Sequence, residues 1–127
     1  MKFAKYAFTI SGTWGILVCI PPLLSEPKAG IGSVALTHPE YYYGFFGVVF
    51  AWQILFFVIA RDPIRYRTAM IPAVLEKAAF VISAPVLFLQ GRVGSVILYF
   101  AFADFVMGIL FLVSFLKTPK RQFTHEI

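Results

Sequence analysis

The chain has 127 residues, of which 60% are hydrophobic and 18% aromatic, with only 13% charged side chains and a net charge of +5. Soluble domains carry about 25% charged residues, so a water-soluble fold of this length could not bury so much apolar surface. The basic residues stand at the ends of apolar runs and form no continuous stripe, which argues against nucleic-acid binding. The composition therefore predicts an integral membrane protein.

The cysteine and histidine content excludes several kinds of redox and metal site. A single cysteine, Cys19, excludes an intramolecular disulfide and a cysteine-built metal site, and sets aside four-helix disulfide-forming quinone reductases. The two histidines, His38 and His125, fall at opposite ends of the expected bundle and cannot together ligate a haem within the membrane. The sequence predicts no metal site and names no cofactor.

The first membrane span is predicted over residues 4–24. Residues 6–25 carry no formal charge, and at about 1.5 Å per residue such a helix crosses the roughly 30 Å hydrocarbon core. A signal peptide is the rival interpretation, but no convincing small-residue cleavage site follows the apolar run. Pro21 and Pro22 are expected to end this helix, because neither can donate a backbone hydrogen bond.

The second span is predicted over residues 39–60, after a loop that contains proline and glycine. Thr37 can cap this helix while Glu40, three residues later, reaches back to complete a capping box. Asp62 before Pro63 is expected to stop the helix and to serve as the N-cap of a short helix that leads into the next span.

The third and fourth spans are predicted over residues 68–90 and 94–116, joined by a tight turn at 91–94. Three charged residues interrupt their apolar runs: Glu76, Lys77 and Asp104. Residues 1–127 are thus expected to form one transmembrane domain with an all-α four-helix bundle fold. No internal repeat supports a transporter built of duplicated halves.

The connecting segments carry unequal charge. The N-terminal segment, residues 61–67 and the C-terminal tail each carry +2, whereas the other two connections carry −1 and +1. The positive-inside rule then predicts that both termini and residues 61–67 lie on the cytoplasmic side of an inner, cytoplasmic membrane.

A polar layer is expected across the bundle interior, because several residues fall near the middle of their spans: Trp14, Gln53, Glu76, Lys77 and Asp104. Each charged residue at mid-membrane costs about 2.5 to 3.5 kcal/mol, so partners are expected. We expect Glu76 and Asp104 to be interior groups with Lys77 as counter-ion, paired with Asp104 or with its stem bent back toward the cytoplasmic face.

Two interpretations of this polar layer stay open. It is either an ion-pair network that fixes helix register or a site for a ligand or a proton. Glu76, Ser83 and Gln90 recur every seven residues, which is the spacing of a seam buried against a partner helix. Small residues at helical spacing predict close helix packing on three spans: Ser11, Gly15 and Cys19; Gly44, Gly47 and Ala51; Ala101 and Gly108.

A second group of residues is expected at the membrane surfaces. A run of tyrosines at the outer end of the second span is typical of an aromatic belt: Tyr41, Tyr42 and Tyr43. Three arginines on the middle cytoplasmic segment would contact anionic headgroups at about 1 kcal/mol per charge: Arg61, Arg65 and Arg67.

Several motifs carry a family resemblance: 38–45 (HPEYYYGF), 51–53 (AWQ), 62–67 (DPIRYR), Glu76-Lys77, Gly91-Arg92 and the region of Asp104. They resemble a group of uncharacterised bacterial four-span proteins of DoxX-like size and layout, over most of the chain. The resemblance implies the four-helix fold and assigns neither a reaction nor a site residue. Because DoxX-type proteins include a quinone-linked membrane subunit, it also implies contact with quinone or lipid.

The function predicted first is binding of a hydrophobic small molecule, such as a quinone, isoprenoid or lipid, in an aromatic-lined cavity within the bundle. The alternative is an accessory subunit of a larger membrane complex, as a homo- or hetero-oligomer in the bilayer. A proton-coupled exporter is less favoured, since the first span has no carboxylate. An enzyme that uses Glu76 or Asp104 as an acid or base stays open.

Overall fold

The computed structural model describes residues 2–24 and 38–120 and contains four long helices. They are α1 (Lys2–Leu24), α2 (Pro39–Arg61), α3 (Met70–Leu89) and α4 (Val96–Lys117), with a 3-10 turn η1 (Arg67–Ala69) before α3. Each helix, with η1 counted into the third, is long and apolar enough to cross a membrane, and the described residues contain no strand. The predicted all-α transmembrane bundle is confirmed.

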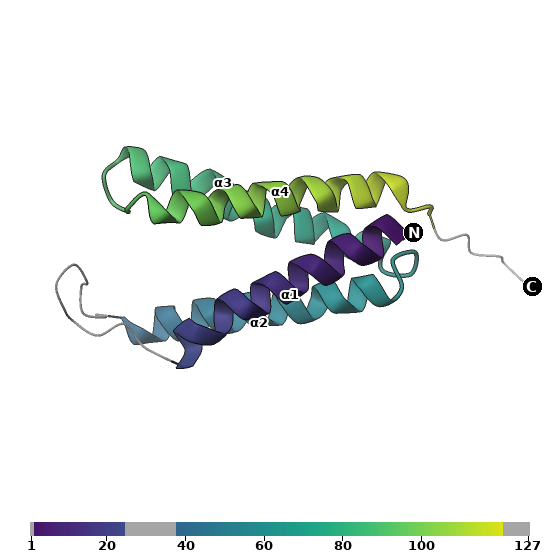
Figure 1. The fold of residues 1–127 in the computed structure, drawn as a ribbon, viewed down its shortest axis with the longest axis horizontal. Helices are drawn as coiled ribbons and strands as arrows, with labels where there is room; N and C mark the ends of the chain where they lie inside the picture. Colours follow the sequence, from purple (N-terminus) through teal and green to yellow (C-terminus); the bar gives the residue numbers. More distant parts are fainter. Residues whose placement is uncertain (1, 25–37, 121–127) are drawn as a thin grey trace, which may run out of the picture.

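The four helices are arranged as two hairpins. In Figure 1, α1 lies along α2 and α3 lies along α4, while the two hairpins contact each other mainly through α1 and α4. The hairpins converge where α1 begins, α2 passes into α3, and α4 ends; we call this the closed end. They diverge at the opposite end, the open end, where α1 ends and α3 passes into α4.

An aromatic cluster holds the hairpins together near the closed end. Phe8 of α1 stacks on Phe111 of α4 with ring centroids 4.2 Å apart, and Phe56 of α2 lies 4.8 Å from Phe111. All three side chains are fully buried, beside Met70 and Ile59. Because lipid tails are as apolar as these side chains, the contact depends on packing and ring geometry, which contribute about 0.5 to 1.5 kcal/mol per aromatic pair.

Small residues bring α1 close to α2, as predicted. Ser11, Gly15 and Cys19 are all buried. A Cβ added at Gly12 would lie 3.0 Å from the Phe57 ring, and one added at Gly15 would overlap the side chain of Gln53. The absent side chains are therefore what allows the two helices to approach.

The same prediction is confirmed on α4 and wrong on α2. Ala101 is buried, and a Cβ at Gly108 would lie 3.3 Å from Cβ of Lys77 on α3. A Cβ at Gly44 or Gly47, in contrast, would meet no described atom within 4 Å, and Ala51 is exposed. This face of α2 points away from the other three helices, so its small residues pack on none of them.

One expected helix end is wrong, and a second expectation lies partly outside the described residues. α1 continues through Pro21 and Pro22 to Leu24, because two prolines in the last described turn remove only two hydrogen bonds and proline's φ suits a helix. At the start of α2, Thr37 lies outside the described residues. Glu40 pairs with Nδ1 of His38 at 3.4 Å, and the side chain of His38 makes no capping bond.

The two connections described between helices follow the predicted turn chemistry. Asp62 Oδ1 accepts the backbone N–H of Arg65 at 3.2 Å, so it caps the turn that leads to η1. Gly91 has a φ of +70°, and the N–H groups of Gly91 and Arg92 donate to the carbonyls of Phe88 and Leu87 at 2.9 Å each. This pattern is a Schellman motif, in which glycine accepts the left-handed conformation without strain.

Candidate functional site

A cleft of about 480 Å³ lies between the two hairpins. Its fourteen lining residues come from all four helices. The volume falls in the roughly 300 to 1,000 Å³ range of small-molecule sites. The cleft brings together all five residues that the sequence placed in a polar layer: Trp14, Gln53, Glu76, Lys77 and Asp104.

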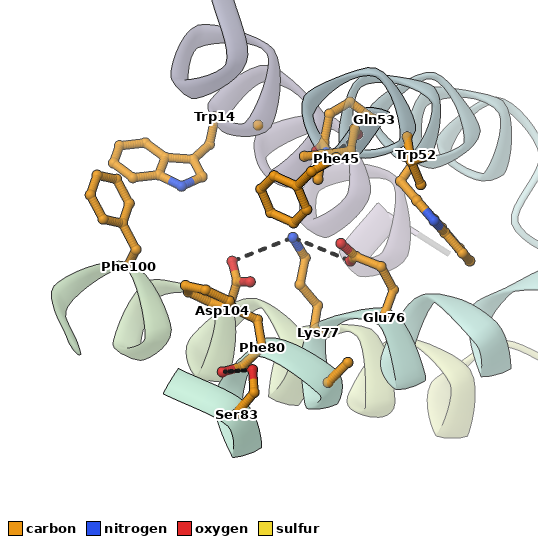
Figure 2. A pocket seen from close by; sticks show the side chains of 14 residues that line it. Trp14, Phe45, Trp52, Gln53, Glu76, Lys77, Phe80, Ser83, Phe100 and Asp104 are labelled. Atoms are coloured by element: carbon orange, nitrogen blue, oxygen red, sulfur yellow. Dashed lines mark hydrogen bonds and ion pairs between the residues drawn. The ribbon is translucent and has the colours of Figure 1, made fainter. Parts of the chain in front are cut away.

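Aromatic side chains form the walls of the cleft. Figure 2 shows Trp14 of α1 beside Phe100 of α4, with Phe45 of α2 nearby. The exposed fractions of these residues are 45%, 39% and 54%, so the cleft is open to its surroundings. Trp52 also lines it, which places both tryptophans of the chain at this site.

A buried lysine between two carboxylates forms the floor. Nζ of Lys77 lies 3.5 Å from Oε2 of Glu76 and 3.5 Å from Oδ1 of Asp104 (Figure 2). It also lies 5.2 Å from the ring centroid of Phe56. Lys77 is only 4% exposed and is the most buried of the three charged residues, so its stem does not bend out to a surface. The pairing of Lys77 with Asp104 matches the expectation from the sequence.

Gln53 completes the floor from the side of α2. It is fully buried, and its Nε2 donates to the carbonyl of Val49 at 2.8 Å. Its Oε1 has no hydrogen-bond partner among the described residues, and neither has Oε2 of Glu76, whose distance to Lys77 is that of an ion pair without hydrogen-bond geometry. Both atoms are covered by the protein, so the groups of the floor that a ligand could meet are the partly exposed carboxylate side chains of Glu76 and Asp104.

The predicted seam along α3 is wrong beyond Glu76. Ser83 and Gln90 are exposed; Ser83 donates to the carbonyl of Phe80 at 3.4 Å, and the side chain of Gln90 accepts from Arg92 at 3.5 Å. The reason is the divergence of the hairpins, because no helix of the other hairpin meets this face of α3 toward the open end (Figure 1).

The tyrosines expected at the membrane surface lie at the open end, at the start of α2. Tyr41 and Tyr43 are exposed. Tyr42 is half-buried, and its hydroxyl donates to the carbonyl of Pro22 at 2.9 Å. Tyr42 therefore links the ends of α1 and α2, a contact that the sequence pattern did not reveal.

The three arginines lie at the closed end, in two kinds of environment. Arg61 and Arg65 are exposed. Nε of Arg67 instead donates to the carbonyls of Thr118 at 2.8 Å and Phe115 at 3.2 Å, and its guanidinium lies 3.8 Å from the ring centroid of Phe115. Arg67 thus caps the C-terminus of α4, where free carbonyls and the helix dipole attract a cation. Sequence reasoning missed this role.

The chemistry available at the floor is hydrogen bonding and charge pairing. No group of three or more His, Cys, Asp or Glu side chains suited to a metal ion occurs in residues 2–24 and 38–120. An ammonium, two carboxylates and an amide can hold the polar group of a molecule whose apolar part lies against the aromatic walls.

Comparisons with protein-family models, with curated proteins and with solved structures found no match to this chain. The four spans and the site define the class of the protein: it is a multi-pass membrane protein with an aromatic cleft above a buried ion-pair network. The DoxX-like affiliation stays a prediction from its sequence motifs.

Proposed function

We propose that this protein binds a hydrophobic small molecule, a quinone, an isoprenoid or a lipid, in the cleft between its two hairpins. The observation that carries the proposal is the position of the Glu76, Lys77 and Asp104 network at the floor of an aromatic cleft of about 480 Å³. The apolar part of the ligand lies against the walls, and its polar group meets the floor.

Two features support a ligand site over a network that only fixes helix register. A register device would bury its ion pairs between helices, yet the side chains of Glu76 and Asp104 stay 17% and 20% exposed at the floor of the cleft. Large aromatic side chains also stay partly uncovered on the cleft walls. Both features are explained by an occupant of the cleft.

The orientation of the protein is part of the proposal. The closed end faces the cytoplasm of a cell with an inner membrane, because exposed basic residues gather there: Lys2, Lys5, Arg61, Arg65, Lys117 and Lys120. The cleft then opens toward the outer leaflet, so a ligand enters from the lipid phase or from the outer surface.

A second candidate function is that of an accessory subunit in a larger membrane complex or homo-oligomer. One observation favours it: the small residues Gly44, Gly47 and Ala51 lie on a face of α2 that no described residue covers. Small residues on a helix allow close approach of a partner helix in the bilayer. The proton-coupled exporter has less support, since α1 carries no carboxylate.

Replacing one of two alanines with phenylalanine, either in the cleft or on the uncovered face of α2, distinguishes the two candidate functions. Ala79 lines the cleft and Ala51 lies on the outer face of α2; both are exposed, so Ala79→Phe fills the cleft and Ala51→Phe obstructs the other face. The measurement is native mass spectrometry after extraction in mild detergent. We expect a hydrophobic adduct on the wild type and on Ala51→Phe that is lost from Ala79→Phe. An adduct unaffected by Ala79→Phe, with a protein partner lost from Ala51→Phe, would favour the accessory subunit.

A further inference from the structure

The floor of the cleft also discriminates between chemical classes of ligand. We infer that the polar group of the ligand is an uncharged hydrogen-bond donor, as in a lipid alcohol or a quinol, and that the cleft selects against anionic phosphate. This inference rests on the proposed function, because it specifies the head group of the molecule bound between the hairpins.

The first step is charge. The charged residues among the fourteen that line the cleft are Glu76, Lys77 and Asp104, so its formal charge is −1. The single ammonium lies 3.5 Å from each carboxylate and is already neutralised by them. A phosphate beside Lys77 would lie beside both carboxylates as well. Proteins that bind phosphate use several donors or a free cation instead, which this floor does not offer.

The second step is hydrogen-bond capacity. The donors of the floor are already engaged, because Gln53 Nε2 donates to the carbonyl of Val49 and Nζ of Lys77 lies between the two carboxylates. The side chains of Glu76 and Asp104 stay 17% and 20% exposed. A hydroxyl can donate to either carboxylate, whereas a deprotonated phosphate or the carbonyl of an oxidised quinone only adds further acceptors to this floor. The floor is therefore complementary to a donor.

The third step is depth. Gln53, Lys77 and Asp104 all lie seven or more residues from either end of their helices, which is at least about 10 Å along the helix axis. A head group that reaches the floor must leave the polar surface of the bilayer. Burial of an ion costs far more than burial of a hydroxyl that gains a hydrogen bond, so depth selects for the uncharged group.

The test compares two probes with the same chain, farnesol and farnesyl monophosphate. Each is titrated separately onto the delipidated full chain in neutral detergent, and the bound fraction is measured by native mass spectrometry. We expect farnesol to bind at least tenfold more tightly, and its binding to be lost in Ala79→Phe. Equal or tighter binding of the phosphate in a manner that Ala79→Phe blocks would overturn the inference and leave the proposed cleft intact. Binding of neither probe, or binding insensitive to Ala79→Phe, would contradict both.

A charge-reversed floor gives a second, independent result. Glu76→Gln with Asp104→Asn changes the formal charge of the floor from −1 to +1 at nearly constant shape, and the preference should then turn to the phosphate. The control is Glu40→Gln with Asp62→Asn, which changes the net charge equally at two exposed sites outside the cleft and should keep the wild-type preference. A similar shift in both double variants would overturn the inference. If the double variant does not fold, Asp104→Asn alone replaces it in the same titration. Its preference between farnesol and the phosphate should lie between those of the wild type and the double variant.

Discussion

Gln53 of α2 lies against Gly15 of α1 so closely that a Cβ at position 15 would overlap its amide group. The glycine thus keeps a fully buried amide at the floor of the cleft while the two helices stay in contact. Packing between α1 and α2 and the composition of the binding site depend on the same pair of residues.

Gly15→Ala should therefore affect both stability and binding. We expect a loss of about 1 to 3 kcal/mol in unfolding free energy from overpacking, with weaker retention of the hydrophobic adduct. Gly44→Ala is the matched control, because nothing described lies within 4 Å of a Cβ there and alanine is the better helix former. The measurement is reversible unfolding in mixed micelles. Equal stability of the two variants would refute the role assigned to Gly15.

Lys77→Met should destabilise the protein strongly, because it leaves two half-buried carboxylates without their counter-ion. Breaking a buried pair in this way costs about 3 to 5 kcal/mol. Adding Glu76→Gln and Asp104→Asn to the same protein should recover part of the loss, since the uncompensated charges are then removed. If Lys77→Met alone is as stable as the triple variant, the three residues do not form a network.

Arg67→Ala should weaken the closed end. The side chain donates to two carbonyls at the C-terminus of α4, and hydrogen bonds from a charged donor contribute about 1.5 to 3 kcal/mol. Arg65→Ala, which removes an exposed charge from the same segment, should cost less than about 0.5 kcal/mol. Unfolding of both variants in the same detergent measures the difference, and equal losses would show that Arg67 acts only through its charge.

Phe111→Ala should separate the hairpins at the point where they meet. Phe111 is fully buried in contact with Phe8 and Phe56, and truncation of a buried phenylalanine typically costs about 3 to 5 kcal/mol. Phe102→Ala, on an exposed face of the same helix, should change stability little. Thermal unfolding monitored by circular dichroism compares them; similar midpoints would mean that the aromatic cluster does not hold the hairpins together.

The orientation has its own test. Fusion of the C-terminus to a reporter active only in the cytoplasm and, separately, to one active only in the periplasm should give a signal from the first alone. The basic residues at the closed end are the physical reason. Activity of the periplasmic reporter would reverse the topology, and the cleft would then open toward the inner leaflet.

The membrane spans could be predicted from the sequence because they depend on local quantities. The length of each apolar run and the charges at its ends brought the predicted boundaries within a few residues of the helices, and Gly91 marked the turn before α4. The pairing of Lys77 with Asp104 could also be predicted, because a buried charge requires a partner and few charged residues lie at that depth.

An aromatic-lined cavity beside the polar layer could be predicted, but not its opening toward one end of the bundle, because that depends on how the two hairpins diverge. The sequence spacing of Glu76 and Ser83 indicates a buried seam, yet α2 leaves that face of α3 uncovered toward the open end. The cap formed by Arg67 joins residues about fifty positions apart, for which the local pattern holds no signal. The expected end of α1 at Pro21 and Pro22 is wrong because a helix tolerates prolines near its end.

The most direct test of a ligand between the hairpins uses the two native tryptophans, both of which line the cleft. The protein in lipid nanodiscs is titrated with a dibrominated fatty alcohol, which quenches tryptophan fluorescence on contact. Occupation of the cleft predicts quenching that saturates at one molecule per chain and that Ala79→Phe abolishes while Ala51→Phe does not. Quenching that rises linearly with the quencher, and equally in all three proteins, would mean that Trp14 and Trp52 only meet bulk lipid and would contradict the binding site.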